Sequence, residues 1–399
     1  MSTTITVSAA DLARVADLLH TAFRGDVLAG GSHKRMGMPV TLWPTGGGLA
    51  SVTIAAAVTD GVASLSIPAT IEGDTLDEFT FSLAAIRDAK ASLGKGDVQL
   101  IIDGDRMTVQ AAGASLLLVS PGPRPRFVGQ TSPDRQASFS LETAALPWVA
   151  NAAGGDDVRP AMTRVNVVAA ESGAESLLIQ GADGFRLHEA RVGAAVSRWD
   201  GAELGPAASV SLPAWLVAVV AKVQPKSIGV WSGWWDDGRH QAAAHCWDGD
   251  LAFQASWSIV GLYPDLHTVT SAIPDDAPVV AGKMADLVGA LTGVKPVAKY
   301  SANIFRVQAC ASGMALEAQA AETGTVRRAV AATGDVFPFA ADVRYWLQAL
   351  GKPKNGAEFA ISMDPRNIKP VGQSAPIRLV TQQPFGEGLA IIMPMHIAR

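Results

Sequence analysis

Cysteine, charge and long apolar runs are all scarce in this chain of 399 residues. Two cysteines, Cys246 and Cys310, are too few for a disulfide framework and fit a reducing compartment. The longest apolar runs, such as Leu116–Val119 and Trp215–Ala221, are far shorter than a membrane span. The N-terminal residues lack the basic and apolar regions of a signal peptide, so we expect a cytoplasmic protein.

Catalytic motifs are also missing. The sequence contains no phosphate-binding loop, no serine-hydrolase elbow, no zinc-protease or paired-cysteine pattern and no dinucleotide fingerprint. The positions of His240 and His245 differ by an odd step, so on one strand the two side chains face opposite sides. Together with Cys246 they make a poor metal site. We therefore expect no catalytic residue, metal or cofactor, and no enzyme.

What remains is a hydrophobic, mildly acidic chain. Hydrophobic residues make up 48% and charged residues 17%, which predicts well-packed globular domains. The net charge of −5 gives no global sign of nucleic-acid binding, so a DNA-binding protein of this composition must gather its cations on one surface. The hairpin tryptophans Trp231, Trp234, Trp235 and Trp247 more often cover a sheet than stack on a ligand.

The order helix, strands, helix, strands recurs about every 130 residues. Apolar periodicity predicts helices at Ala9–Phe23, Leu83–Leu93, Leu141–Ala153, Leu212–Val223, Lys283–Thr292 and Ala340–Leu350. Alternating segments between them predict antiparallel hairpins. We therefore expect an α+β protein of three similar domains, at residues 1–131, 132–272 and 273–399, each with two helices packed on antiparallel sheets.

Four separated motifs carry a family resemblance. Asp157–Arg191 is a pair of alternating strands with a tight corner at Gly181–Gly184. Ile259–Asp265, Phe339–Leu350 and the tail Leu389–Ile397 follow it in order. Together they resemble bacterial DNA polymerase III β subunits, the replicative sliding clamps, of which this chain looks like a divergent member.

The resemblance implies a head-to-tail homodimeric ring of clamp domains with helices inside and sheets outside. Such a ring encircles double-stranded DNA without regard to sequence and acts as a processivity factor in DNA replication, in the cytoplasm at the nucleoid. It performs no chemistry and tethers DNA polymerase and clamp-loader subunits through their short linear motifs. An alternative is an accessory, phage-type or inhibitor-resistant clamp that serves as an interaction platform outside main replication.

The resemblance also implies an apolar pocket for partner peptides between the second and third domains. Its residues here would be Met162, Ala182, Gly184, Phe185, Arg186, Leu187, Pro264, Thr268, Val269, Pro376, Met393, Pro394, Met395 and His396. Phe185 stands where the family often has His, and Thr268 and His396 stand where Arg is common. A more apolar and less cationic pocket follows, although such residues could also be ordinary interdomain core.

Basic residues late in the helices and in nearby loops are the candidate DNA contacts. They are Lys34, Arg35, Lys90, Lys95, Arg159, Lys222, Lys226, Lys295, Lys352 and Lys354. Cations at helix C-termini also complement the helix dipole, which is the alternative explanation for each lysine.

The candidate dimer interface joins the first domain of one chain to the third of the other. It combines Leu116 and Leu118 of an apolar strand with Met284, Leu287 and Leu291 of a helix. An enzyme using the acidic loop Asp236-Asp237 is a further class, disfavoured because no acid–base pair with a nucleophile is visible.

Overall fold

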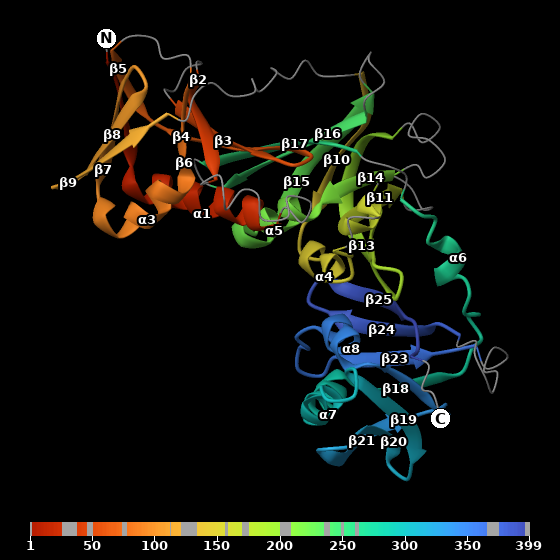
Figure 1. Cartoon of the computed structure of the whole chain (residues 1–399). Helices are drawn as coiled ribbons and strands as arrows, with labels where there is room; N and C mark the ends of the chain where they lie inside the picture. Colours follow the sequence, from red (N-terminus) through yellow and green to blue (C-terminus); the bar gives the residue numbers. More distant parts are fainter. Residues whose placement is uncertain are drawn as a thin grey trace. The chain divides into compact units, whose positions relative to one another are not determined.

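The computed structural model describes most of the chain. The described residues are 2–25, 38–45, 51–73, 78–111, 113–120, 134–155, 159–169, 175–199, 209–234, 240–248, 251–259, 263–364 and 375–395. The chain forms two compact units. Unit 1 comprises Met1–Thr143 and Ala194–Gly261, and unit 2 comprises Ala144–Gly193 and Leu262–Arg399. Figure 1 shows helices lying against antiparallel strands in both.

A small sheet in unit 1 has the strand order β5-β1-β7-β8-β9. Its strands are β1 (Thr3–Ser8), β5 (Thr70–Gly73), β7 (Asp97–Asp103), β8 (Arg106–Ala111) and β9 (Ala114–Val119). Burial alternates along β7 and β8, as expected for strands with one face on the core. β9 ends the sheet and pairs only with β8 among the described strands.

A larger antiparallel run of strands completes unit 1. In pairing order it contains β6 (Phe79–Ser82), β2 (Pro39–Thr45), β3 (Ser51–Val58), β4 (Gly61–Pro68), β17 (Leu251–Ser258), β16 (His240–Asp248), β15 (Ser227–Trp234), β10 (Asp134–Glu142) and the last residues of β13 (Arg186–Trp199). Strand β14 (Ser209–Pro213) precedes the helix α5 (Ala214–Val223). Helix α1 (Ala9–Gly25) packs against α5, α3 (Leu83–Leu93) and the sheet. The indole Nε1 of Trp257 donates to the Ser211 carbonyl at 2.7 Å, which ties this sheet to β14.

Unit 2 has a continuous antiparallel sequence of strands. In pairing order these are β11 (Arg164–Ala169), β12 (Ser176–Ala182), β13, β25 (Gly386–Ile392), β24 (Ile377–Gln383), β23 (Glu358–Ser362), β18 (Val279–Lys283), β21 (Gly324–Thr333), β20 (Gly313–Ala320), β19 (Ile304–Cys310) and β22 (Phe339–Asp342). Helices α7 (Met284–Ala298) and α8 (Val343–Leu350) pack on one another and on this sheet. Trp346 of α8 is buried, stacks on Phe339 and meets the edge of Phe305, so aromatic packing fixes α8. The short helices α4 (Leu146–Ala150), η2 (Pro160–Thr163) and α6 (His267–Thr270) lie at its loops.

The element order repeats along the chain. Each copy begins with a strand and a helix, continues with a run of strands, and ends with a second helix and three antiparallel strands. In each copy the opening strand pairs with the first strand after the second helix, as β1–β7, β10–β15 and β18–β23. The predicted α+β class of two helices on antiparallel sheets is confirmed. The division at residues 131 and 272 stays a prediction.

The predicted helices differ in accuracy. Leu83–Leu93 is helical as predicted, but the helix predicted over Leu141–Ala153 is wrong for its first residues and too long. Strand β10 continues through Leu141, because burial of Ala137, Phe139 and Leu141 follows a period of two. Helix α8 begins at Val343, three residues later than predicted, because the Asp342 carboxylate accepts the Arg344 backbone N–H as an N-cap.

Candidate functional site

A tight turn in unit 2 presents an aromatic side chain to solvent. The Asp183 carboxylate accepts the backbone N–H groups of Phe185 and Arg186 at 2.9 and 3.1 Å. Gly184 between them has a φ of 90°, a conformation that other residues rarely adopt. The turn holds Phe185 with 58% of its surface exposed. A single exposed phenylalanine is ordinary, but one that adjoins other exposed apolar residues is a candidate binding surface.

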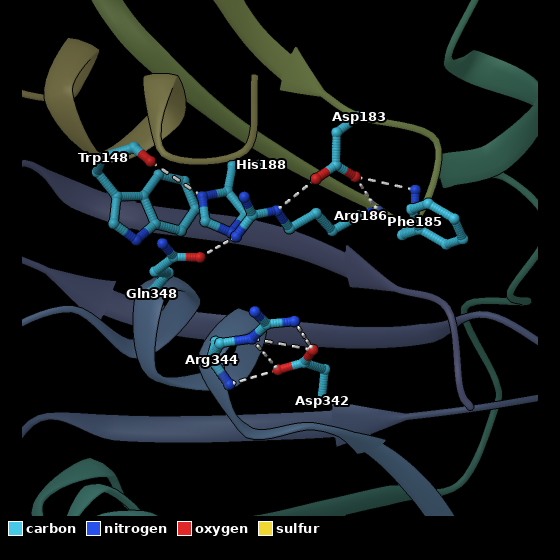
Figure 2. A network of polar contacts seen from close by, with 8 residues as sticks. All are labelled: Trp148, Asp183, Phe185, Arg186, His188, Asp342, Arg344 and Gln348. Carbon is cyan, nitrogen blue, oxygen red and sulfur yellow. Dashed lines mark hydrogen bonds and ion pairs between the residues drawn. The ribbon is translucent and has the colours of Figure 1, made fainter. Parts of the chain in front are cut away.

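The charge of Arg186 beside this turn is largely neutralised. Its guanidinium donates to Asp183 Oδ2 at 3.0 Å and to Gln348 of α8, and it lies 4.4 Å from the centre of the Tyr345 ring. Figure 2 shows Arg186 directed from β13 towards α8. The side chain is only 9% exposed, so the surface next to Phe185 is more apolar than the sequence suggests.

An apolar cluster lies under the same turn. Its buried members are Ala182, Leu187, Tyr263, Leu266, Ile273, Ala277 and Ile391, and Ala161, Met162, Val269 and Leu389 pack against it. The Met393 backbone N–H donates to the Phe185 carbonyl at 2.8 Å, so the C-terminal tail lies beside the turn. The structure therefore joins three stretches that are far apart in sequence.

The predicted pocket residues occupy different depths. The buried members of the apolar cluster form the floor of the predicted pocket. Ala182 and Leu187 belong to this floor, and Met162 and Val269 are partly buried against it. The exposed members are Gly184, Phe185, Pro264, Thr268 and Met393, and the partly buried ones are Arg186, Pro376, Pro394 and Met395. His396 lies outside the described residues. We call Phe185, Pro264 and Met393 with their floor the apolar patch.

Sequence reasoning missed part of the floor. Tyr263 is 3% exposed and burial raises the pKa of its hydroxyl well above the usual range. Ile273 and Ile391 are 1% exposed each. Tyr263 adjoins the predicted Pro264 in the Ile259–Asp265 motif, so that motif could have indicated it. Ile273 had no comparable signal, because it follows a short irregular segment.

A buried histidine lies on β13, close to the turn. His188 of β13 stacks on Trp148 with 4.4 Å between ring centroids, and its Nδ1 lies 2.9 Å from the Trp148 carbonyl (Figure 2). Nδ1 therefore carries the proton and donates to that oxygen, whereas Nε2 is buried and has no hydrogen-bond partner among the described residues. Burial lowers the pKa of His188 to about 4. Protonation would bury a second, unsatisfied N–H.

This histidine predicts acid sensitivity. Its folded-state pKa lies below the ordinary 6.5, so its contribution to stability is complete above pH 6.5 and is lost as the pH falls towards 4. The loss is at most about 3 kcal/mol. His188→Gln keeps a donor for the Trp148 carbonyl and cannot ionise. Urea unfolding at about pH 7 and about pH 4.5 should show a smaller acid-dependent loss in this variant than in the wild type. Equal losses would contradict the assignment, and exposed His245→Gln is the matched control.

The predicted basic residues lie on helices and loops of both units. In unit 1, Lys95, Lys222 and Lys226 are exposed, and Lys90 lies in α3. In unit 2, Lys295, Lys352 and Lys354 are exposed. Lys34 and Arg35 lie outside the described residues.

Arg159 occupies a different place from the other cations. A Cβ added to Gly184 would lie 3.2 Å from Arg159 Nη1, which puts this guanidinium beside the turn of the apolar patch. Sequence reasoning also missed Arg24 of α1 and Arg87 of α3, two cations that lie near His20. Only the packing of α1 against α3 and α5 brings them together.

The predicted dimer contacts require correction. Met284, Leu287 and Leu291 are at most 1% exposed, and Leu118 is 8% exposed, within the single chain. Met284, Leu287 and Leu291 belong to the core beneath α7, and Leu118 to the core beneath β9, so these side chains offer little surface to another molecule. Leu116 is partly buried. The exposed apolar residues of β9 are its neighbours Leu117 and Val119, at 57% and 58%.

The histidines of β16 face opposite sides, as predicted. His240 is buried, whereas His245 is exposed, and its ring lies where a Cβ on Gly229 would be. Among the described residues, no group of three or more His, Cys, Asp or Glu side chains could hold a metal ion. Trp247 of β16 is 66% exposed, and Trp231 is partly buried.

Solved structures of bacterial DNA polymerase III β subunits, the DNA sliding clamps, share this fold over the whole chain. The β subunit from Thermotoga maritima has a TM-score of 0.76 and 17% identity, covering 99% of this chain and 100% of its own. The β sliding clamp of C. crescentus has a TM-score of 0.75 and 17% identity, with 99% of both chains covered. The sliding clamp of Bacillus subtilis has a TM-score of 0.74 and 15% identity, with both chains covered completely. The chain therefore has the sliding-clamp fold.

No protein-family model and no curated protein sequence matches the chain. At 15–17% identity the resemblance is one of fold, consistent with the divergence that the four short motifs indicated. No helix in the described part of the chain is long and apolar enough to cross a membrane.

Proposed function

We propose that the protein is a DNA sliding clamp, a processivity factor that encircles duplex DNA and tethers a polymerase without chemistry of its own. The observation that carries the proposal is the match of complete chains, with TM-scores of 0.74 to 0.76 against three bacterial clamps. A local resemblance could come from one shared domain. A match over the full length of both chains extends the likeness to the whole molecule.

The apolar patch is the proposed site for partner peptides. Phe185 and Met393 provide exposed apolar side chains over a buried floor, and Met adapts to several partners. Arg186 is held by Asp183 and Gln348, so it contributes little charge. We therefore propose that the preferred peptide docks mainly through apolar and aromatic side chains, with the Arg159 guanidinium beside the turn at the edge of the patch.

DNA contact is proposed for the exposed lysines near the helices. Lys95, Lys222 and Lys226 in unit 1 and Lys295, Lys352 and Lys354 in unit 2 carry the charge. Arg24 and Arg87 are added to them from the structure. Phosphate contacts of this kind are independent of sequence, so their energy changes little as the ring moves along the duplex.

Ring closure is proposed through two sheet edges. β9 ends its sheet with Leu117 and Val119 exposed. β21 pairs with β18 only through Ala332 and Thr333, so within the described residues the rest of that edge has no neighbouring strand. Edges of this kind are templates for strand addition. The acidic turn Asp103–Asp105 next to β9 and the exposed Arg327 and Arg328 of β21 give the two edges opposite charge.

The test of the proposed function is retention on DNA with and without ends. Protein loaded on nicked circular DNA should stay bound through a high-salt wash, whereas protein on the same DNA after linearisation should slide off. Salt weakens phosphate contacts equally in both samples, so only encirclement distinguishes them. We expect retention on circles to exceed retention on linear DNA by about tenfold or more, with light scattering giving a dimer in solution. Equal loss from both templates would reject a ring.

An accessory clamp outside main replication is a second candidate. Phe185 and Thr268 make the apolar patch less cationic than the family pattern, which favours a different partner peptide. A polymerase-derived clamp-binding peptide and the retention assay separate the two functions. Retention on circles without peptide binding would favour the accessory clamp, and both together would favour the replicative one.

A further inference from the structure

Three helices of unit 1 bring cationic groups around one histidine. His20 and Arg24 lie one helical turn apart on α1, so they share a face. Arg87 of α3 places its Nη1 3.2 Å from the imidazole of His20. The ammonium of Lys222 on α5 donates to the hydroxyl of Thr21, the next residue of α1, at 3.3 Å. We call His20, Arg24, Arg87 and Lys222 the His20 cluster.

The contacts of His20 define its protonation state. Its Nδ1 lies 3.2 Å from the sulfur of Met38, which is a weak acceptor and cannot donate. Arg87 Nη1 lies 3.2 Å from both ring nitrogens and can only donate, so it bonds whichever nitrogen carries no hydrogen. Because the Met38 sulfur can only accept, we assign the ring hydrogen to Nδ1 and the acceptor role to Nε2. Both contacts require a neutral imidazole, and a proton added to Nε2 would break the bond from Arg87.

Among the described residues, cations outnumber carboxylates around this ring. Burial lowers the pKa of His20 from 6.5, and Arg87, Arg24 and Lys222 lower it further, whereas Asp17 raises it. The other carboxylate nearby, Asp88, pairs with Arg87 at 3.0 Å. In the absence of an anion the ring is therefore neutral at neutral pH. An anion bound at this surface would offset the positive charges around His20, and the pKa of the ring would rise.

We propose that a DNA backbone phosphate binds at the His20 cluster and that its binding is coupled to uptake of one proton by His20. The inference rests on the proposed function and adds that one proton is taken up when DNA binds. The proton comes from solvent and attaches to Nε2. Nε2–H and the Arg87 guanidinium, released from the ring nitrogen, then both donate charge-assisted hydrogen bonds to phosphate oxygens.

Linkage gives the sign of the pH effect. The pKa of His20 is higher in the complex than in the free protein, so the complex binds more protons. Affinity for DNA therefore rises as the pH falls. Between the two pKa values it increases by up to about tenfold per pH unit, and above both the contribution is constant. The salt dependence of DNA binding measures all phosphate contacts together, so it does not distinguish the contribution of His20 from the others.

The experiment measures protons directly. The full-length protein is titrated with a linear duplex of about 20 base pairs, too short to retain a ring, in two buffers of different ionisation enthalpy at about pH 6.5. The difference in heat gives the number of protons taken up. We expect the wild type to take up a substantial fraction of one proton and His20→Gln to lose that fraction while still binding. His245→Gln, which removes an exposed histidine of β16 that is not part of the cluster, is expected to behave as the wild type.

The outcomes separate this inference from the proposed function. Equal proton uptake by wild type and His20→Gln, or duplex binding with no uptake, would reject the coupling and leave the clamp function intact. Proton-coupled duplex binding without retention on circles would reject the ring and keep the phosphate site. Absence of any duplex binding would reject the phosphate site, and retention on circles would still decide the ring. Should His20→Gln misfold by circular dichroism, NMR titration of the His20 ring with and without duplex replaces the variant, and an unshifted pKa rejects the coupling.

Discussion

Replacement of Leu117 and Val119 by lysine is expected to convert the protein from a dimer to a monomer and to abolish retention on circular DNA. Both side chains are exposed by 57% and 58% on β9, which ends its sheet among the described strands, so the substitutions should leave the fold of unit 1 intact. Burying two ammonium groups against an edge that carries Arg327 and Arg328 costs several kcal/mol. The dimer should therefore weaken by about a thousandfold or more, measured by analytical ultracentrifugation.

The matched control for this prediction is Trp247→Lys. It places the same charge on an exposed apolar residue of unit 1, but on β16 instead of β9. It should leave both the dimer and the DNA retention unchanged. A dimer of normal affinity in the Leu117→Lys, Val119→Lys double variant would show that β9 is not part of the interface. Reversal of charge at Arg327 and Arg328 then tests β21 independently.

The sequence predicts the fold well because its strongest signals are local. Helix Leu83–Leu93 is bounded by a serine and a glycine, and the structure has the same bounds. The hairpins around Asp103–Asp105 and Gly181–Gly184 are marked by turn residues, which select their geometry through the backbone alone. The helix predicted over Leu141–Ala153 is partly wrong for a physical reason. A short apolar run fits the period of a helix as well as that of a buried strand.

The candidate sites are less predictable because they depend on packing between distant segments. Met284, Leu287 and Leu291 have the spacing of an apolar helix face, and that spacing is the same for a core and for an interface. Arg87 could not be linked to His20 from sequence, because α1 and α3 are separated by several strands. The direction of the Arg186 side chain depends in part on Gln348 of α8, and no periodicity relates the two.

Within unit 2, the backbone bond between Phe185 and Met393 has a consequence for partner binding. Because the Phe185 carbonyl accepts from the Met393 N–H, side-chain changes at either residue leave that link in place. The double variant Phe185→Ala, Met393→Ala should therefore keep the turn, the ring and the DNA retention. It removes the two most exposed apolar groups of the patch.

The double variant is expected to bind a polymerase-derived clamp-binding peptide at least about a hundredfold more weakly than the wild type. Exposed aromatic anchors contribute about 2 kcal/mol or more each when a partner covers them, and methionine adds adaptable apolar contact. Fluorescence anisotropy with the labelled peptide measures the loss, and Trp247→Ala, which removes an exposed aromatic in unit 1, should bind normally. Undiminished binding in the double variant would locate the peptide elsewhere. Lost peptide binding with normal retention on circles would show that partner binding and DNA encirclement use separate surfaces. A sliding clamp requires this separation, because it must hold a partner and DNA at the same time.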